Sequence, residues 1–402
     1  MKSAPPCVLA VNGGSSSIRF VIFEASRILS RRLAGKIDRI GLRGATLVVH
    51  GPLGKPQPPK RIAASNHLQA VDFLLNWLEV QPAFLSVKAV GHRVVHGMKH
   101  SAPARITPRL LAELRRITPY DPEHLPREIG LIEAIKRRYP KLPQVACFDT
   151  AFHRTMPRVA KLLPIPRRYA AKGVERYGFH GLSYSYLMEE LQRLDPVAAK
   201  GRVILAHLGN GASLAAIHRG KSIDTSMGFT PAAGLVMSTR SGDLDPGLLS
   251  FLARREKMTS VQFEQMVNHG SGLLGISETS SDMRDLLARE TRDVRAADAI
   301  ALFCYQARKW IGAYAAALGG LDTLVFAGGI GENIPVIRQR ICGELGFLGV
   351  ALNPRANRES AAVISRRSGR VRVRVIRTDE ELMIARSINR TLGLGPSDGG
   401  RA

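Results

Sequence analysis

The segment "CVLAVNGGSSSIRFVIF", from Cys7 to Phe23, carries the pattern from which the fold can be predicted. Two apolar runs of strand length flank the segment Asn-Gly-Gly-Ser-Ser-Ser, which predicts two strands joined by a tight turn. A hairpin needs only two turn residues such as Asn-Gly, so the turn itself does not require the second glycine and the serines. Glycines and hydroxyl groups of this kind bring backbone N–H groups and side chains close to an anion.

The opening pattern occurs a second time in the chain. "VLAVNGGSSSIRFVIF" (Val8 to Phe23) can be laid on "VILAHLGNGASLAAI" (Val203 to Ile217), and both read as strand, small polar turn and strand. A spacing of about half the chain indicates duplicated halves rather than a solenoid of short repeats. The length of 402 residues also favours two domains. Two such turns facing each other would hold the phosphates of a nucleotide between the domains.

A third glycine-rich segment supports a nucleotide site. "LDTLVFAGGIGENIPVIRQRIC" (Leu321 to Cys342) predicts a buried strand, a glycine turn and a helix whose N-terminus lies near a ligand. It lacks the G-K-[ST] ending of a P-loop and the G-x-G-x-x-G spacing. Each segment alone is explained by a structural turn, whereas three such segments at matching places favour a nucleotide-binding site. Strand patterns such as 143–153 alternate with helix patterns such as 296–318, which predicts an α/β fold.

Composition favours a cytoplasmic protein. Hydrophobic residues make up 45% of the chain, and no apolar run reaches the ~20 residues of a membrane helix. The first residues do not show the pattern of a secretory signal. The cysteines are widely spaced, which predicts free buried thiols rather than disulfides or a zinc site. They are Cys7, Cys147, Cys304 and Cys342.

The chain is strongly basic. Lys and Arg number 58 against 33 Asp and Glu, a formal charge of +25, which is compatible with a nucleic-acid partner, an anionic small substrate or an arginine-rich proteome. In the densest run, 365–378, Arg370, Arg372 and Arg374 alternate with valines, which predicts a strand with one exposed and one buried face. No aromatic residue interleaves with these arginines, so the run favours a solvated face over specific nucleic-acid binding.

Four polar residues stand near the ends of predicted strands, where ligands bind in open α/β sheets. They are Arg93, Asp149, His180 and Arg240. The set suits phosphoryl transfer, in which the protein mainly positions the reactants and neutralises charge. Arginine binds carboxylate and phosphate through two parallel hydrogen bonds, and a carboxylate acceptor is ionised at pH ~7 and needs no general base. For Mg²⁺, which prefers oxygen ligands, Asn12 and Glu380 are the candidates.

These residues also have structural interpretations. Arg93 and Asp149 are equally compatible with a buried ion pair, and a single histidine is more often structural than catalytic. His92 and His96 stand four residues apart, as metal ligands can, but no third ligand follows at zinc spacing.

Nine motifs between Val8 and Arg386 resemble the acetate and propionate kinase family. They are "VNGGSSSIRF", "VGHRVVHG", "FDTAFHRTMP", "YGFHGLSY", "HLGNGASL", "SMGFTPAAGL", "TRSGDLDPG", "AGGIGEN" and "TDEELMIAR". The resemblance implies an α/β fold of two duplicated ribonuclease-H-like domains with an interdomain nucleotide cleft, as in sugar kinases, Hsp70 and actin. We expect an N-terminal domain of residues 1–150 plus a C-terminal helix 384–402, and a nucleotide-binding domain of residues 151–383.

The activity that the resemblance implies is reversible transfer of the ATP γ-phosphoryl group to acetate, giving acetyl phosphate and ADP. The cofactors would be ATP or ADP with Mg²⁺ or Mn²⁺, and the protein would be a homodimer without a membrane or nucleic-acid partner. A kinase of propionate or another short-chain carboxylate is an alternative, because one methylene changes binding by only ~1–3 kcal/mol. A non-catalytic ATP-binding switch of the same fold is another, although a switch does not need an arginine clamp for a carboxylate.

The resemblance also implies residue roles. Arg93 and Arg240 contact substrate and phosphoryl group, Asp149 orients the reaction or supports the metal, and His180 stabilises the transition state. Asn12 and Glu380 serve the metal, and Ser15, Ser17 and Arg19 lie near the phosphates. The expected ATP-binding residues are His207, Leu208, Gly209, Asn210, Gly211, Asp282, Met283, Arg284, Gly329, Ile330, Gly331, Glu332 and Asn333. The expected pocket for the acetate methyl group is Val95, Phe179 and Pro231.

The chain departs from the family pattern at two places. Arg19 stands where the family usually has lysine, so a planar guanidinium replaces a compact ammonium. The segment "ITPYDPEHLPRE" (Ile117 to Glu128) replaces the usual "APLHNPPN". There we assign His124 to the place of the family histidine, with a spacing that differs by about one residue. Pro122 or Glu123 then stands near the position of an apolar pocket residue, which leaves the acyl-chain preference open.

Overall fold

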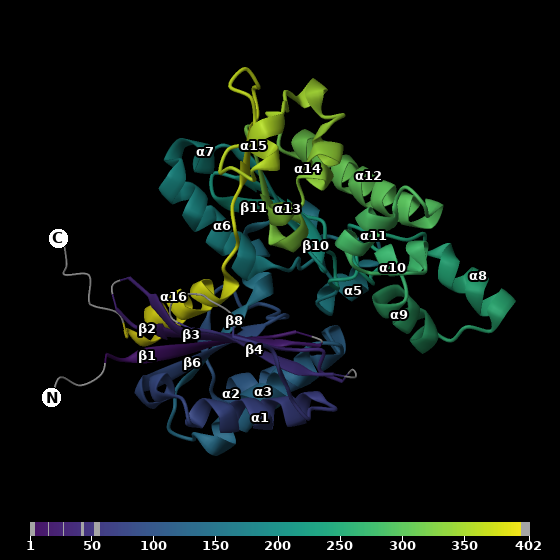
Figure 1. The fold of residues 1–402 in the computed structure, drawn as a ribbon. Helices are drawn as coiled ribbons and strands as arrows, with labels where there is room; N and C mark the ends of the chain where they lie inside the picture. Colours follow the sequence, from purple (N-terminus) through teal and green to yellow (C-terminus); the bar gives the residue numbers. More distant parts are fainter. Residues whose placement is uncertain (1–4, 15, 27, 42–43, 52–56, 395–402) are drawn as a thin grey trace. The chain divides into compact units, whose positions relative to one another are not determined.

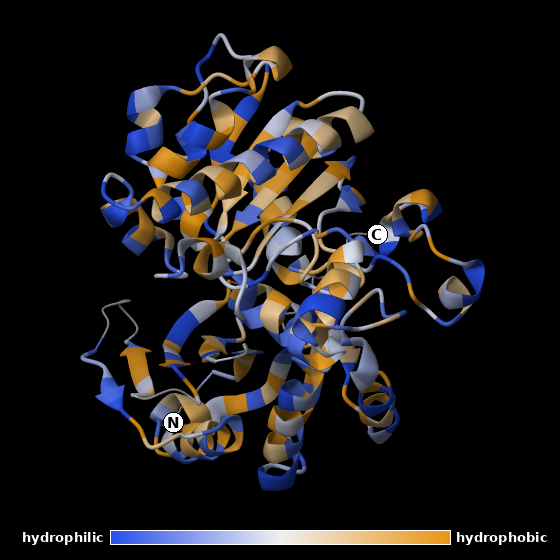
Figure 2. Cartoon of the chain, turned by 90° about the vertical axis from the view of Figure 1, so that its right-hand side faces the viewer, coloured by the Kyte–Doolittle hydropathy of each residue, from blue (hydrophilic) through white to orange (hydrophobic). Residues whose placement is uncertain are grey.

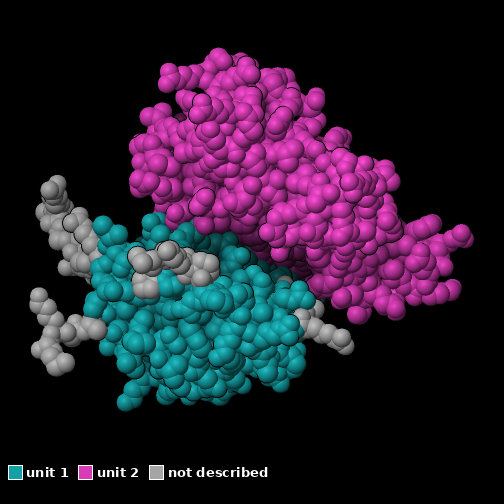
Figure 3. Space-filling model, in the orientation of Figure 1, with its two compact units in different colours: residues 1–151, 379–402 teal, residues 152–378 magenta. Residues whose placement is uncertain are grey.

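The computed structural model describes residues 5–394 except 15, 27, 42–43 and 52–56. The chain divides into two compact units, residues 1–151 with 379–402 and residues 152–378, coloured separately in Figure 3. Each unit contains one β-sheet covered by helices, and each is described on its own.

The first unit contains an eight-stranded sheet in the order β5-β4-β3-β2-β1-β6-β8-β7 (Figure 1). Its strands are β1 (Cys7–Gly13), β2 (Ile18–Glu24), β3 (Ser30–Asp38), β4 (Thr46–His50), β5 (Lys60–Arg61), β6 (Val87–Val94), β7 (Ala104–Arg105) and β8 (Gln144–Phe148). The predicted hairpin is confirmed, because β1 and β2 pair antiparallel with Asn12 opposite Arg19. On its other side β1 pairs parallel with β6, and β6 pairs parallel with β8.

Helices cover both faces of this sheet. They are α1 (His67–Glu79), α2 (Pro108–Arg116), α3 (Leu125–Arg138) and α16 (Glu380–Leu392), with the short 3-10 helices η1 (Pro82–Ser86) and η2 (Thr118–Tyr120). In Figure 1, α1 to α3 lie on one side of the sheet and α16 on the other. The approach of α16 is close, because a Cβ atom on Gly91 would lie 2.5 Å from Ile384 and 2.7 Å from Ile388. A glycine in β6 therefore lets α16 pack directly on the sheet.

The second unit contains a five-stranded sheet in the order β11-β10-β9-β12-β13. Its strands are β9 (Arg202–Leu208), β10 (Ala212–His218), β11 (Lys221–Thr225), β12 (Thr323–Ala327) and β13 (Arg372–Val375). Figure 2 shows that hydrophobic residues run along these strands, which form the core of the unit with the helices around them.

The helices of the second unit are mostly short. The 3-10 helix η3 (Asp149–Thr155) leads into it from the first unit. The others are α4 (Arg158–Lys161), α5 (Arg167–Ala171), α6 (Gly181–Leu194), α7 (Pro196–Lys200), α8 (Gly247–Glu256), α9 (Ser260–His269), α10 (Gly272–Ser277), α11 (Met283–Arg289), α12 (Val294–Ala317), α13 (Gly328–Asn333), α14 (Pro335–Cys342), η4 (Gly346–Leu348) and α15 (Pro354–Arg358). The long helix predicted at 296–318 is therefore confirmed as α12.

The two sheets repeat one arrangement, as the sequence repeat predicted. In the first unit the strands run β3-β2-β1-β6-β8, and in the second they run β11-β10-β9-β12-β13. In both, three antiparallel strands are followed by two strands parallel to the central one. The first unit adds β4 and β5 at one edge and β7 at the other.

Two local predictions are wrong. The arginines of the strand in 365–378 are expected on an exposed face, but Arg374 is only 9% exposed and pairs with Asp195 at 2.5 Å. The segment "AGGIGEN" does not form a glycine turn before a helix; its residues Gly328–Asn333 are themselves a short helix, α13. The four cysteines are free and buried, as predicted. Among the described residues, no helix combines the length and the apolar character needed to cross a membrane.

Candidate active site

In the first unit, the residues predicted at strand ends lie together. Because β1, β6 and β8 are parallel neighbours, their carboxyl ends reach the same edge of the sheet. Arg93 Nη2 and Nε lie 2.6 and 2.8 Å from Asp149 Oδ2. Arg93 Nη1 donates to Asn12 Oδ1 at 3.5 Å. Asn12 Nδ2 donates to Glu380 Oε2 at 2.8 Å and to Glu381 Oε1 at 3.2 Å. Glu381, which the sequence reasoning missed, therefore belongs to this cluster.

Neighbouring carboxylates keep the arginine of this cluster charged. Asp149 is fully buried, and the Arg93 side chain is 15% exposed. Burial by itself would lower the pKa of Arg93, but the carboxylates of Asp149 and Glu380 outweigh it and raise that pKa. Arg93 is therefore charged at every physiological pH, held by one carboxylate along one edge of its guanidinium. The ion pair and the catalytic interpretation of these two residues are compatible.

The oxygen atoms around Asn12 fit a magnesium ion. Mg²⁺ usually keeps several waters and takes one or two carboxylates together with substrate phosphates. Glu380 and Glu381 are half-buried carboxylates at the N-terminus of α16. Burial and the neighbouring Glu380 raise the pKa of Glu381, while Arg19 opposes this rise. Among the described residues no group of three or more His, Cys, Asp or Glu side chains is arranged to hold a metal. Water and substrate phosphates would therefore have to complete the ligands that the two glutamates and Asn12 offer.

A buried glutamate also stands beside this cluster. Both carboxylate oxygens of Glu128 accept from the backbone N–H of Val95, at 3.2 and 3.1 Å. Glu128 is 4% exposed, and burial raises its pKa well above the usual range, although Arg93 lowers it. The sequence contains a signal for the burial of Glu128, because this residue falls on the apolar stripe of α3 formed by Leu125, Ile129 and Ile132.

The altered segment 117–128 places His124 at the N-cap of α3. Its Nδ1 lies 2.8 Å from Oδ1 of Asp121, which is 3% exposed. His124 is thus oriented by a buried carboxylate, as a positioned histidine would be. The proposed phosphate residues follow Asn12 in the sequence. Ser17 is half-exposed, Arg19 is exposed on β2, and Ser15 lies outside the described residues.

In the second unit, two catalytic candidates converge over a glycine. A Cβ atom on Gly211 would lie 2.9 Å from Arg240 Nη2 and 3.1 Å from His180 Nε2. Arg240 Nη1 donates to the carbonyl of Pro231 at 2.7 Å. His180 Nδ1 lies 2.9 Å from Ser213 Oγ. The tips of both side chains are therefore directed at the same place, next to the turn between β9 and β10.

His180 has an unusual backbone conformation. Its φ of 59° lies in the left-handed region, where residues other than glycine are uncommon and cluster at functional sites. Its ring stacks on His207, with centroids 4.3 Å apart and planes at 21°. His207 Nδ1 bonds Ser183 Oγ at 2.8 Å, and Ser183 bonds Thr378 Oγ1 at 2.8 Å. These contacts fix both imidazoles at the carboxyl end of β9.

Two of the three predicted ATP-binding segments lie side by side. Residues 207–211 form the end of β9 and the turn to β10, and residues 329–333 belong to α13, which follows the neighbouring strand β12. A Cβ atom on Gly209 would lie 3.7 Å from the nitrogen of Gly329. Glu332 Oε1 accepts from the N–H groups of Gly328 and Thr378, at 2.8 and 3.0 Å. This carboxylate anchors the first turn of α13.

The third segment begins helix α11. Asp282 caps this helix by accepting from the N–H of Arg284 at 2.8 Å, and it also pairs with the Arg284 guanidinium at 2.6 Å. Met283 is 2% exposed and belongs to the core. Its side chain is therefore occupied in packing.

The three residues predicted for the acetate pocket are divided between the units. Val95, 2% exposed, belongs to the first unit and is held by Glu128. Phe179 and Pro231 belong to the second, where the Phe179 carbonyl accepts from His153 Nε2 at 3.0 Å. Each of these residues is fixed by a backbone hydrogen bond to a side chain of its own unit.

Curated relatives cover nearly the whole chain. An acetate kinase of Rhodopseudomonas palustris (strain ATCC BAA-98 / CGA009) is 43% identical over 401 residues, which is 98% of this chain and 99% of the relative. A propionate kinase of Citrobacter rodentium (strain ICC168) is 42% identical over 392 residues, covering 95% of this chain and 96% of the relative.

The crystal structure of a propionate kinase from Francisella tularensis subsp. tularensis SCHU S4 has the same fold. It superposes with a TM-score of 0.90 at 34% identity, over 96% of this chain and 100% of that one. The acetokinase family pattern matches residues 7–386, which include every described candidate residue above. The duplicated sheets, the clusters at the strand ends and these relatives agree, and the chain belongs to the acetokinase family.

Proposed function

We propose that the protein transfers the γ-phosphoryl group of ATP reversibly to acetate, giving acetyl phosphate and ADP. Membership of the family makes it a kinase, a phosphotransferase with a carboxyl acceptor. The observation that carries the proposal is the Arg93–Asp149 pair at the carboxyl ends of parallel strands. It offers a charged, oriented guanidinium to a carboxylate or phosphoryl oxygen.

In the proposed reaction an acetate oxygen attacks the γ-phosphorus, and the bond from phosphorus to the ADP oxygen breaks. The acetate is already ionised, so no proton has to be removed from it. Catalysis then consists of positioning and of neutralising the oxygens of the moving group. Arg93 and Arg240 are proposed to bind these oxygens, and His180 Nε2 to donate a hydrogen bond to them. Asp149 holds Arg93 in place.

The metal and nucleotide roles follow the same proposal. Asn12, Glu380 and the neighbouring Glu381 would hold Mg²⁺, or Mn²⁺ in its place, which neutralises phosphate charge when bound. Ser15, Ser17 and Arg19 are proposed to serve the phosphates. Residues 207–211, 282–284 and 329–333 are proposed to hold ATP.

A propionate kinase is the second candidate, because relatives of that name are nearly as similar to this chain. The pocket residues proposed for the acyl chain are Val95, Phe179 and Pro231. One methylene in such a pocket is worth ~1–3 kcal/mol, so a single side chain can decide between the two substrates. A nucleotide switch is less well supported, because a switch does not need two arginines, Arg93 and Arg240, to bind a substrate carboxylate.

Further parts of the proposal concern the whole protein. The two compact units are proposed to be its two domains, the N-terminal one being completed by α16. We also propose a cytoplasmic homodimer with no specific nucleic-acid partner. Size-exclusion chromatography with light scattering would measure the oligomeric state, and a mass of one chain would contradict the dimer.

The decisive experiment is trapping of acyl phosphate with hydroxylamine in the presence of MgATP, comparing kcat/KM for acetate, propionate and butyrate. We expect acetate to lead by about tenfold, which corresponds to ~1.4 kcal/mol. A lead of propionate or butyrate would keep the reaction and change the substrate. No acyl phosphate from any of them, together with ATP binding, would support the switch.

A further inference from the structure

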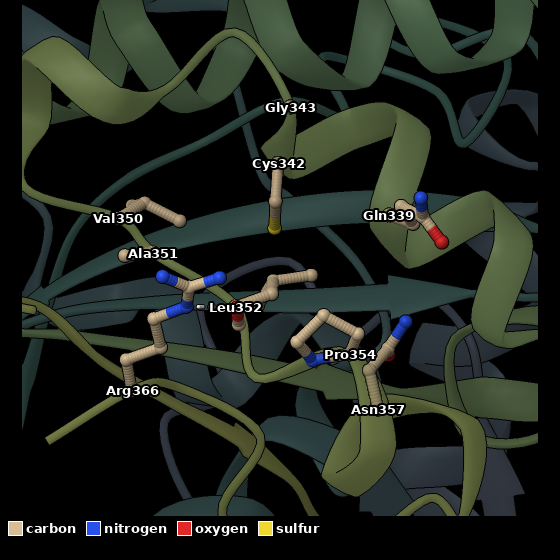
Figure 4. A pocket seen from close by; sticks show the side chains of 9 residues that line it. All are labelled: Gln339, Cys342, Gly343, Val350, Ala351, Leu352, Pro354, Asn357 and Arg366. Carbon is tan, nitrogen blue, oxygen red and sulfur yellow. Dashed lines mark hydrogen bonds between the residues drawn. The ribbon is translucent and has the colours of Figure 1, made fainter.

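A small pocket lies in the second unit, apart from the residues assigned above to catalysis. It has a volume of about 290 Å³ and lies between the C-terminal end of α14, α15 and the loop that joins them. The lining residues are Gln339, Cys342, Gly343, Val350, Ala351, Leu352, Pro354, Asn357 and Arg366. Figure 4 shows the Cys342 thiol pointing into the space above Leu352, with the Arg366 guanidinium at one side and Gln339 at the other.

Part of the lining of this pocket is apolar. Cys342 and Val350 are 4% exposed, and Leu352 and Pro354 add aliphatic surface. Burial raises the pKa of the Cys342 thiol to about 12, with Arg338 and Arg308 opposing the rise. The thiol is therefore protonated at neutral pH and acts as an apolar wall rather than as a nucleophile.

The charge of the pocket is positive. Arg366 Nε donates to the Leu352 carbonyl at 3.2 Å, which holds the guanidinium at the rim. None of the nine lining residues is acidic, and within the described part of the chain no carboxylate forms an ion pair with Arg366. In Figure 4 one terminal nitrogen of the guanidinium lies on the side of the Cys342 thiol, and a guanidinium suits a carboxylate.

One wall of the pocket is bonded to the proposed nucleotide segment. Asn357 Oδ1 and O accept from Nε and Nη2 of the fully buried Arg338, at 2.9 and 2.7 Å. Arg338 Nη1 donates in turn to the carbonyls of Gly331 and Glu332 in α13, at 2.8 and 3.0 Å. A displacement of α15 would therefore be transmitted through one arginine to the backbone of α13.

We propose that this pocket is an effector site for a small organic monoanion, a carboxylate with a compact apolar body, whose binding changes the nucleotide affinity of α13. An apolar cavity of ~150 Å³ holds a benzene, so a pocket of about 290 Å³ has room for a benzene ring that carries a carboxylate. A benzoate is such a ligand, with its carboxylate on Arg366 and its ring against Leu352 and Cys342. The coupling part rests on the proposed nucleotide role of α13, whereas the binding part does not.

Binding is tested with the full chain and 4-fluorobenzoate, followed by its ¹⁹F NMR signal. The neutral 4-fluorobenzamide serves as the control ligand. We expect the benzoate to bind and the benzamide to bind about tenfold more weakly, because only the anion pairs with Arg366. Equal binding of the two ligands, or no binding of either, would overturn the site.

Variants locate the bound anion. Arg366→Gln should weaken 4-fluorobenzoate binding about tenfold, while Arg367→Gln, which changes the exposed neighbour, should leave it unchanged. Ala351→Phe fills the pocket from the loop and should abolish binding, with the urea midpoint of each variant confirming that it folds. An equal effect of Arg366→Gln and Arg367→Gln would contradict the site, because it would show that the anion is attracted by the net positive charge of the chain and not by Arg366 in particular.

Coupling is tested by measuring the Kd of ADP calorimetrically with and without saturating 4-fluorobenzoate. We expect a change of about fivefold or more in wild type and none in Ala351→Phe. By linkage, saturating ADP must change the Kd of 4-fluorobenzoate by the same factor. Anion binding without any change in the Kd of ADP would overturn the effector role. Absence of ADP binding would instead contradict the proposed function and leave the anion site standing.

Discussion

Among single residues, Arg240 is the one whose loss should separate catalysis from nucleotide binding. Its Nη1 is held by the Pro231 carbonyl, and its Nη2 lies beside His180 Nε2 over Gly211. We predict that Arg240→Ala lowers kcat by about 10³-fold, the range of groups that neutralise a transferring phosphoryl group, and changes the Kd of ADP little. Steady-state kinetics and calorimetry measure both. An unchanged kcat, or an equal loss in the exposed control Arg254→Ala, would contradict the assigned role.

Glu128 should make the folded state less stable as the pH rises. Burial raises its pKa in the folded chain well above 4.5, so above pH ~4.5 the unfolded chain releases a proton that the folded chain retains. The free energy of unfolding then falls as pH rises toward the folded-state pKa. Glu128→Gln keeps an acceptor for the Val95 N–H without a charge, so its stability should increase relative to wild type between pH ~5 and ~8. The comparison uses urea midpoints, with Glu123→Gln as control, and a difference that is independent of pH would show that Glu128 is ionised when folded.

Among the elements, the turn between β9 and β10 and the interior of α12 provide a matched pair of glycine substitutions. At Gly211 a Cβ atom would meet Arg240 Nη2 and His180 Nε2, the ends of side chains that can move, whereas at Gly312 it would meet nothing within 4 Å. We predict that Gly211→Ala lowers kcat at least tenfold with little loss of stability. Gly312→Ala should leave kcat unchanged and gain about 0.5–1 kcal/mol, because alanine favours a helix interior. A normal kcat in Gly211→Ala would mean that those two side chains are not directed at the reacting group.

The same elements show what the sequence could predict. The hairpin β1–β2, the strand β12 and the helix α12 were predictable because their signals are local: alternating or continuous apolar residues next to glycine. The glycines of α13 disfavour a helix and therefore predict a turn, but Glu332 stabilises the helix by accepting from the N–H of Gly328. The alternating pattern predicts Arg374 in solvent, because its partner Asp195 is distant in the sequence and leaves no local signal. The role of Glu128 was missed for the same reason, since Val95 belongs to another element.

In the whole molecule, the duplication explains where the polar residues lie. The aligned repeats place Asn12 and His207 at equivalent points, just before the turn that follows the central strand of each sheet. The next parallel strand of each sheet then adds Arg93 in β6 and the first turn of α13 after β12. The repeated strand order therefore places the proposed ligand-binding groups at the carboxyl ends of the central strands in both units, as a charge cluster in the first and a glycine-rich segment in the second.

Buried histidines should make the whole molecule sensitive to acid. Burial lowers the pKa of His92, His96 and His153 to about 4 from 6.5. As pH falls from 6.5 toward 4, the unfolded chain takes up protons that the folded chain refuses, so stability is lost across that window. The first two histidines belong to the first unit and His153 to the second. Each unit should therefore lose stability on acidification through its own groups.

The two tryptophans allow this to be measured unit by unit, because Trp77 lies in α1 and Trp310 in α12. In a Trp310→Phe background, urea unfolding followed by Trp77 fluorescence reports on the first unit. His92 Nε2 bonds Gln144 Oε1 at 2.6 Å, and His92→Gln can retain a donor there without a titrating group. We predict that in this variant the free energy of unfolding depends less steeply on pH between pH 4 and 6.5. The slope should fall by about the contribution of one proton, ~1.4 kcal/mol per pH unit. The exposed His218→Gln should match wild type. If His92→Gln also matched it, His92 would be taking up its proton in the folded state, and the acid sensitivity of the first unit would have to come from other groups.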